Sequence, residues 1–461
     1  MFAPLLAVAI IAQGAPGMVA AQAGNLEGRP RAEEASPLQA RIDAASPGAR
    51  IDVTAGRYVG DLYIDRPVHL VGLGRPQLVG SGAGSVVRIR ADGVVIEGFD
   101  IDGRIGGSLA RDSSGIHVAA RHVTVRDCRI AHAFFGVYLR EADDAVVDHV
   151  VVEGLEGRAP GEQGSGIHVW NTAGFHLLDN QVRFSRDGLY IQASPHGVVV
   201  RNTVSDVRYG LHYMFSDANT FEDNTFERSA AGAALMYSTD LVFRRNRFLH
   251  NRGFASAGLL LQGCDDVIAE DNLIADNARG IFLEGTHRTS FRHNVIAESD
   301  DAVIAYDSAS GSRFEENAFV ANLSPLLLVG RRTDAVFDRN YWSDHREADL
   351  DGDGVIDVPY RLSNVFDHLR GNLTAADLLA QGLGAAVLSA AERTFPVLDP
   401  TPVVDAHPLA RPPELPDVPA PPPPPAGGHV LGVTVSAATL VCGLLTLSAG
   451  RRSGQPPARP S

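Results

Sequence analysis

Hydrophobic and polar positions repeat along the middle of the chain with a period of about 22 residues. The clearest copies follow one another from Gly188 to Asn246, and each joins a leading glycine to an asparagine fourteen residues later. Such a period, with alternating aliphatic positions, is typical of a solenoid whose turns each add strands to parallel sheets. The sequence therefore predicts an all-β fold of stacked turns. The leading position runs through Gly115, Gly136, Gly166, Gly188, Gly210, Gly232, Gly258, Gly280, Ala302 and Pro325.

Four positions in each copy predict the core. Residues one and three places after the glycine are aliphatic, as in Leu189 and Ile191, and those on either side of the asparagine are aliphatic or aromatic, as in Phe221 and Phe226. Because side chains alternate between the two faces of a strand, all four are expected to point inward. The asparagines are expected to form a structural ladder of amide hydrogen bonds. This column holds Asn180, Asn202, Asn224, Asn246, Asn272, Asn294, Asn317 and Asn340.

The ends of the chain depart from the repeat. An apolar stretch that closes with Ala21-Gln22-Ala23 favours a cleaved secretory signal peptide, with an uncleaved apolar tail as the alternative. About twenty uncharged residues before Arg451 suit one membrane helix with a cytoplasmic C-terminus, with a processing signal as the alternative. A periplasmic body anchored to the inner membrane is expected. The predicted segments are a signal peptide (1–23), an N-terminal cap with the first irregular turns (36–114), regular β-helix repeats (115–342), a C-terminal cap with an acidic loop and a helix (343–408), a proline-rich linker (409–429) and a transmembrane helix (430–449).

An acidic loop follows the last regular turn. Asp349, Asp351 and Asp353 match the first half of a calcium-binding loop, but the twelfth position is Tyr360 where an EF-hand has glutamate. The sequence leaves two interpretations open, a bound Ca²⁺ or a plain acidic turn that ends the solenoid.

Charge and cysteine content exclude some classes of protein. The net charge of -15 and the pI of about 5.5 argue against a nucleic-acid-binding protein, which would show a basic surface. The three cysteines, Cys128, Cys264 and Cys442, have no spacing that suggests a disulfide or a zinc site. Cys128 falls in the asparagine column, where a buried structural thiol is expected.

Positions two and four places after the glycine should point outward on the same sheet, and there the residues are unusual. Met214 and Met236 occupy the same position in adjacent turns, and His212 lies two residues before Met214. Adjacent strands lie ~4.8 Å apart, so both thioethers can reach one point, and thioether plus imidazole is a donor set that suits Cu(I). His168 is a fourth candidate ligand. Residues expected to shape the site or to contact a partner or ligand are Trp170, Tyr190, Gln192 and Tyr237.

Two other interpretations of this strip remain open. Methionines and aromatic residues also form adaptable docking surfaces for proteins. A polysaccharide-binding groove, with lyase or epimerase activity, is the third possibility. The strip lacks a convergent carboxylate cluster, and Asp187 is expected at a turn beside it. The Asp-Pro-His motif of alginate epimerases appears only as Ser194-Pro195-His196, so no catalytic residue is assigned and the chain is not expected to be an enzyme.

Several specific motifs resemble the NosD family. Beyond the repeat, the asparagine-tyrosine-tryptophan piece and the acidic loop match that family, and the likeness covers about Ser36 to Pro408. The matching runs are Gly210-Leu-His-Tyr-Met-Phe-Ser, Gly232-Ala-Ala-Leu-Met-Tyr-Ser, Gly258-Leu-Leu-Leu-Gln, Arg279-Gly-Ile-Phe-Leu-Glu-Gly, Asn340-Tyr-Trp-Ser-Asp, Asp349-Leu-Asp-Gly-Asp-Gly-Val-Ile-Asp-Val-Pro-Tyr-Arg and Glu392-Arg-Thr-Phe-Pro.

The resemblance implies a right-handed parallel β-helix that serves as a periplasmic accessory protein in the maturation of nitrous oxide reductase. It implies an ABC transporter formed by NosF and NosY as a partner, copper received from the chaperone NosL, and help in building the copper centre of the reductase NosZ. It implies no enzymatic activity. The proline-rich linker and the membrane segment at 430–449 depart from the usual pattern of the family.

Overall fold

A computed structural model describes residues 36–106, 113–159, 162–253, 256–362, 370–372 and 403–413. The expected signal peptide, the helix expected near Ala375 to Thr394 and the expected membrane segment lie outside these residues. None of the helices in the described ranges is long and apolar enough to cross a membrane.

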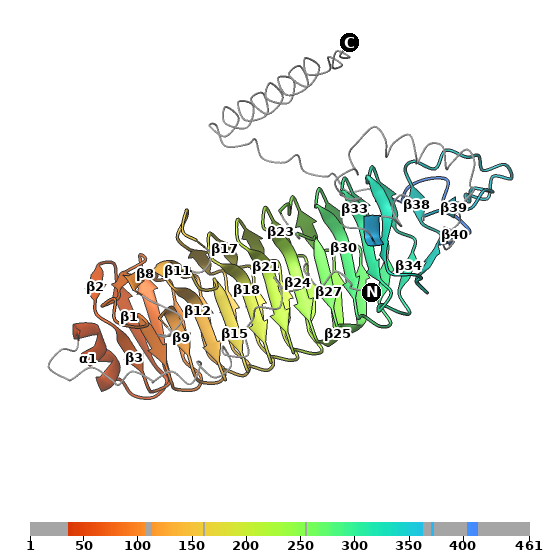
Figure 1. Ribbon diagram of the computed structural model, residues 1–461. Coiled ribbons are helices and arrows are strands. Elements are labelled where there is room, and N and C mark those ends of the chain that lie inside the picture. Colours follow the sequence, from red (N-terminus) through yellow and green to blue (C-terminus); the bar gives the residue numbers. More distant parts are fainter. Residues whose placement is uncertain are drawn as a thin grey trace, which may run out of the picture. The chain divides into compact units, whose positions relative to one another are not determined.

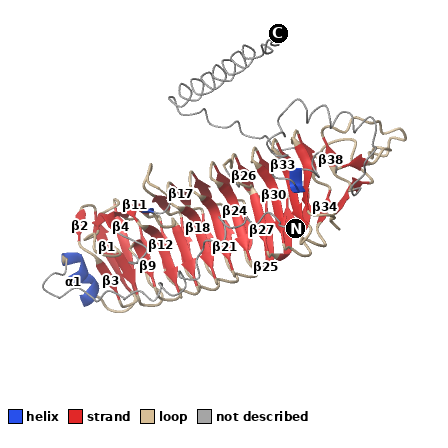
Figure 2. Cartoon of the chain, in the orientation of Figure 1, coloured by secondary structure: helices blue, strands red, loops and turns tan. Residues whose placement is uncertain are grey.

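The described chain is a parallel β-solenoid, as the period predicts. Successive strands pass to three sheets in turn, and each strand pairs in parallel with its equivalent in the next turn (Figure 1). Apart from the N-terminal helix, the stack is built almost entirely of strands and short turns (Figure 2). The prediction of an all-β parallel β-helix is confirmed.

The three sheets are named A, B and C. Sheet A consists, in spatial order, of β1 (Ala49–Thr54), β4 (Val68–Leu73), β7 (Val95–Glu97), β10 (Thr124–Arg126), β13 (Val146–Asp148), β16 (His176–Leu178), β19 (Val198–Val200), β22 (Thr220–Glu222), β25 (Thr239–Arg244), β28 (Asp265–Glu270), β31 (Ser290–Arg292), β34 (Arg313–Glu315), β37 (Val336–Asp338), β40 (Val404–Asp405) and β39 (Tyr360–Arg361). Sheet B consists of β2 (Arg57–Val59), β5 (Gln77–Val79), β8 (Asp100–Gly106), β11 (Arg129–Ala133), β14 (Val151–Glu153), β17 (Gln181–Arg183), β20 (Thr203–Ser205), β23 (Thr225–Glu227), β26 (Arg247–Leu249), β29 (Leu273–Ala275), β32 (Val295–Ala297), β35 (Ala318–Val320) and β38 (Tyr341–Trp342). Sheet C consists of β3 (Leu62–Ile64), β6 (Val87–Ile89), β9 (Ser114–Val118), β12 (Phe135–Arg140), β15 (Ile167–Trp170), β18 (Asp187–Gln192), β21 (Tyr209–Met214), β24 (Ala231–Met236), β27 (Leu259–Gln262), β30 (Arg279–Glu284), β33 (Asp301–Tyr306) and β36 (Ser324–Val329).

A short helix, α1 (Pro37–Ala44), caps the open N-terminal end. The Ser36 hydroxyl accepts a hydrogen bond from the amide of Gln39, and proline occupies the first turn, and both features favour the start of a helix at this point. The side-chain amide of Gln39 both accepts from and donates to the backbone of Tyr63, at 2.8 and 2.9 Å. This amide therefore satisfies the exposed edge of β3 as a further strand would.

The leading glycines are required by close packing. A Cβ added at Gly188 would lie 2.1 Å from Cγ1 of Val204 and 2.7 Å from the carbonyl oxygen of Gly210. The column thus lets sheets B and C meet at a corner without a side chain between them. The residues predicted to point inward from all three sheets form one continuous buried core.

The asparagine ladder is present and runs in one direction. Each side-chain Nδ2 donates to the Oδ1 of the next asparagine at 2.9–3.0 Å, from Asn180 to Asn340. The last donor, Nδ2 of Asn340, is accepted by the buried carboxylate of Asp405 at 3.0 Å. The repeat ends at Trp342 in the sequence, but sheet A continues through β40, about 60 residues later.

Candidate functional site

The outward face of sheet C carries a column of rings. Positions two places after the leading glycine point away from the core, as predicted. Neighbouring ring centroids along the column lie 4.3–5.1 Å apart. The column is mostly buried because each ring covers the next. The sequence did not predict this burial. The rings in order are His117, Tyr138, His168, Tyr190 and His212.

The two methionines meet as predicted. Met214 and Met236 are direct partners in the pairing of β21 with β24. Met236 is buried and Met214 is half-buried, and both belong to a second apolar cluster outside the core. Ala234, the partner of His212 in the same pair of strands, is small. The thioethers and the imidazole therefore lie on adjacent positions of one surface.

His212 is held by an acidic residue that the sequence placed at a turn. Asp187 is in fact the first residue of β18 and is fully buried. Its Oδ2 lies 3.2 Å from Nδ1 of His212, and Arg208 makes two contacts of 2.8 Å with the carboxylate. Burial by itself would raise the pKa of Asp187, but the hydrogen bonds and charges of His212 and Arg208 together hold that pKa well below its usual value.

This arrangement defines which nitrogen of His212 is available. An ionised carboxylate only accepts hydrogen bonds, so Nδ1 of His212 carries the proton and donates to Asp187. The guanidinium of Arg208, 3.4 Å from the same nitrogen, cannot then donate to it. In the neutral imidazole, Nε2 then keeps its lone pair and is the atom that can bind a metal. The position just before the leading glycine holds residues of different types along the chain, so the repeat gave no signal for this neighbour.

His168 does not join the methionines. It pairs with Tyr190, and Tyr190 pairs with His212, so two strand spacings of ~4.8 Å each separate the two imidazoles. Both ring nitrogens of His168 are buried without a hydrogen-bond partner among the described residues. Burial lowers the pKa of His168 to about 3, and the ring is therefore neutral.

The predicted accessory residues take different positions. Trp170 pairs with Gln192 in the register of β15 and β18, and the guanidinium carbon of Arg140 lies 5.2 Å from the centroid of its ring. The hydroxyl of Tyr190 donates to Gln192 at 2.7 Å, which fixes this part of the strip. Tyr237 lies at the turn after Met236, where it stacks on Phe215, an aromatic residue for which no role was predicted. The repeat contains that signal, because an aromatic residue follows each methionine.

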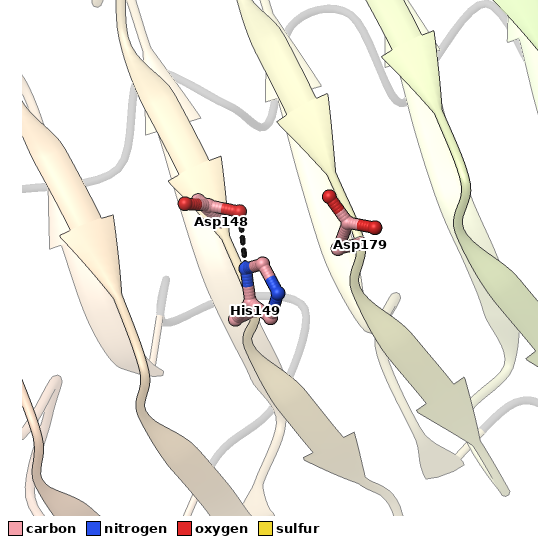
Figure 3. Close-up of side chains that lie close together, drawn as sticks. All are labelled: Asp148, His149 and Asp179. Carbon is pink, nitrogen blue, oxygen red and sulfur yellow. Dashed lines mark hydrogen bonds and ion pairs between the residues drawn. The ribbon is translucent and has the colours of Figure 1, made fainter.

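A second group of possible metal ligands lies on another part of the surface. Oxygen or nitrogen atoms of Asp148, His149 and Asp179 come within 4.8 Å of one another (Figure 3). Nδ1 of His149 is 2.6 Å from Asp148, and Arg201 binds both oxygens of Asp179. The hydrogen bond and charge of Asp148 raise the pKa of His149. His149 and Arg201 thus already engage these carboxylates, and the group is a hydrogen-bonded and ion-paired network.

The acidic loop satisfies the distance requirement for a cation. Ligand atoms of Asp349, Asp351 and Asp353 also lie within 4.8 Å of one another. Both oxygens of Asp349 accept backbone amide hydrogen bonds, from Gly352 at 2.7 Å and Gly354 at 3.0 Å. These bonds give the loop its shape without an ion, so the geometry agrees with either interpretation of the sequence.

The fold and the strip together define a class of protein: a parallel β-helix with a thioether and imidazole cluster on the outer face of one sheet. A family model described as "Periplasmic copper-binding protein (NosD)" matches residues 149–371, which include the whole cluster. A protein of Pseudomonas aeruginosa named "Probable ABC transporter binding protein NosD" is 29% identical over 399 residues, 83% of this chain and 92% of the relative. A protein of the same name from Stutzerimonas stutzeri is 29% identical over 377 residues, 77% of this chain and 86% of that protein.

Together, the family model and the two relatives support a NosD-family protein. The family description supports a periplasmic, copper-binding accessory protein, and the relatives' names connect the family with an ABC transporter. Among solved structures, the A-modules of the mannuronan C-5 epimerases AlgE6 and AlgE4 of Azotobacter vinelandii have TM-scores of 0.56 each. They are 15% and 16% identical, over 65% and 64% of this chain and 93% and 94% of theirs, and show a shared fold only.

Proposed function

We propose that the chain acts as a periplasmic scaffold that carries Cu(I) during assembly of the copper centre of nitrous oxide reductase. NosF and NosY as the transporter subunits, NosL as the copper donor and NosZ as the acceptor are the partners that the family resemblance suggests. A C-terminal membrane anchor at 430–449 is part of the proposal and rests on hydropathy alone.

The observation that supports copper binding is the register of β21 and β24. It places Met214 beside Met236 and puts His212 two residues away on the same face. Two soft sulfurs and one imidazole nitrogen suit Cu(I), and few oxygen ligands are present that would favour Mg²⁺ or Ca²⁺. The cluster is partly open, because Met214 and His212 are only half-buried. A cargo ion can therefore enter and leave.

We propose Met214, Met236 and Nε2 of His212 as the ligands. His168 is left out of the set because Tyr190 lies between it and His212. Trp170 and Gln192 border the site on the preceding turns.

The test replaces both methionines with leucine, which keeps the apolar volume and removes the sulfur. We expect the double variant Met214→Leu and Met236→Leu to bind Cu(I) at least about 100-fold more weakly, since two of three ligands are lost. Affinity is measured by competition with a chromogenic Cu(I) chelator. Leu260→Met, which adds a thioether on the same apolar face, serves as the control. Equal Cu(I) affinity in the folded double variant would rule out this site.

A polysaccharide enzyme receives less support from the geometry. Asp187, the buried carboxylate of the strip, is engaged by Arg208 and His212, and its low pKa makes it a poor general acid. Turnover of a uronate polymer by the purified protein would favour this alternative.

A further inference from the structure

Two aromatic side chains stand together on the surface beside the proposed copper site. Phe215 and Tyr237 follow the two methionines, and their rings stack with centroids 5.3 Å apart and an interplanar angle of 11°. They are 53% and 54% exposed. We call this pair the aromatic ridge. Large apolar rings exposed as a pair are typical of a surface that contacts another molecule.

Aromatic residues are a costly choice at this turn. Phe215 and Tyr237 have φ values of 52° and 53°, in the left-handed region that bulky side chains disfavour. The equivalent turn position in neighbouring strands of sheet C is alanine at 193 and glycine at 263 and 285. These neighbouring turns therefore adopt the same backbone conformation without a ring at the position. Neither ring belongs to the core or to the second apolar cluster, so packing of those clusters does not account for them.

The ridge is bordered by carboxylates without cationic partners. Asp217 accepts a backbone hydrogen bond from Thr239 at 2.8 Å, which places it in the same pair of turns. Asp240 follows Thr239 and is exposed. No ion pair of either carboxylate occurs within the described ranges. Arg288, further along this edge, is already engaged by Asp266 at 2.7 Å.

We infer that the aromatic ridge docks a cationic segment of a partner protein. An arginine or lysine side chain can stack on the free face of Phe215 and pair with the carboxylates beside it, which combines cation-π and ionic attraction. The net charge of -15 adds long-range attraction for a basic partner. A segment bound here lies next to Met214 and Met236, yet the inference requires no metal and stands apart from the proposed copper site.

The charge around the aromatic ridge favours a basic protein segment as the occupant. A uronate polymer is anionic and would be repelled by Asp217 and Asp240. A purely apolar partner would leave both carboxylates without a counter-ion at the interface, which is unfavourable.

The test uses the full-length protein and a short fluorescent peptide that alternates arginine and leucine, with a glutamate and leucine peptide for comparison. Binding is followed by fluorescence anisotropy at low and high salt. One variant combines Phe215→Ala with Tyr237→Ala, and another combines Asp217→Asn with Asp240→Asn. Asparagine at 217 keeps the acceptor for Thr239, so the turn is preserved. The matched control joins Leu323→Ala and Glu156→Gln, which change an exposed apolar residue and an exposed acid elsewhere.

We expect the basic peptide to bind in a salt-sensitive manner, and each ridge variant to weaken it about tenfold while the control does not. Three results would overturn the inference: no binding of the basic peptide, equal binding by the ridge variants, or a preference for the acidic peptide. Binding of an oligouronate that is lost in the aromatic variant would assign the ridge to a sugar. Because no copper is present, the outcome is independent of the metal proposal.

Discussion

Two buried imidazoles make individual residues of this protein sensitive to acid. Burial lowers the pKa values of His117 and His168 to about 3 each from an ordinary 6.5. Between these values the unfolded chain binds protons that the folded chain does not, so stability falls as the pH drops below 6.5. At pH 5 we expect a loss of about 2 kcal/mol for each histidine.

The measurement is the free energy of unfolding between pH 7 and pH 5, for the natural chain and for His168→Phe. Phenylalanine keeps the ring stack with Tyr138 and Tyr190 but removes two buried nitrogens without partners. The variant should be at least as stable at pH 7 and should lose less stability at pH 5. An identical pH dependence in the two proteins would contradict the assigned protonation state.

A second residue-scale prediction concerns Asp187, which positions His212 and touches no cargo in our proposal. In the metal-free protein, side-chain ¹⁵N chemical shifts should show the proton of His212 on Nδ1. In Asp187→Asn the amide can donate to or accept from that nitrogen, so we expect a mixture of the two tautomers and weaker Cu(I) binding. A thermal melt controls for folding. If His212 of the unsubstituted protein carries its proton on Nε2, Asp187 does not position the imidazole as proposed.

The sequence predicted which side chains point inward or outward, but it predicted fewer of the contacts between them. Alternation along a strand is a local property, so the inward columns and the outward pair Met214 and Met236 followed from spacing. Burial of the outward rings and the bond from Asp187 to His212 depend on neighbours in other turns. The position before the leading glycine holds residues of different types, so its role was not visible from the repeat.

At the scale of elements, the asparagine ladder needs a hydrogen-bond acceptor for its last member, Asn340. The carboxylate of Asp405 in β40 accepts hydrogen bonds from three buried donors: the backbone N and the side-chain Nδ2 of Asn340, at 2.9 and 3.0 Å, and Nε1 of Trp342, at 3.1 Å. No repeat signal marks Asp405, because it reaches sheet A from a distant part of the chain. The sequence therefore predicted the ladder and missed its end.

Removal of that carboxylate should loosen the C-terminal turns. Asp405→Ala leaves three buried donors without an acceptor, and we expect a loss of about 3 kcal/mol or more. Asp405→Asn should cost less, since one acceptor oxygen remains. Hydrogen exchange in β37 and β38 and the melting temperature measure the effect. Asp338→Asn, a change at an exposed ion pair with His407, is the control. If both substitutions at position 405 have the same effect as the control, Asp405 does not stabilise the end of the ladder.

At the scale of the whole molecule, the period alone was enough to predict the architecture. Each turn contacts mainly its neighbours, so a regular local pattern specifies the solenoid. The position of the strip along it follows from the same count of turns. What the period cannot give is the return of residues 403–405 to sheet A, since that pairing is not periodic.

The one-directional ladder also makes the body extensible. Every asparagine of the ladder before Asn340 donates to an identical neighbour, so a whole additional turn of 22 residues could enter between the methionine pair and Asp405 without altering either. Each such turn would move the two apart by ~4.8 Å. The number of repeats between them thus sets the distance from the methionine pair to Asp405. Duplication of whole turns would change this distance in fixed steps.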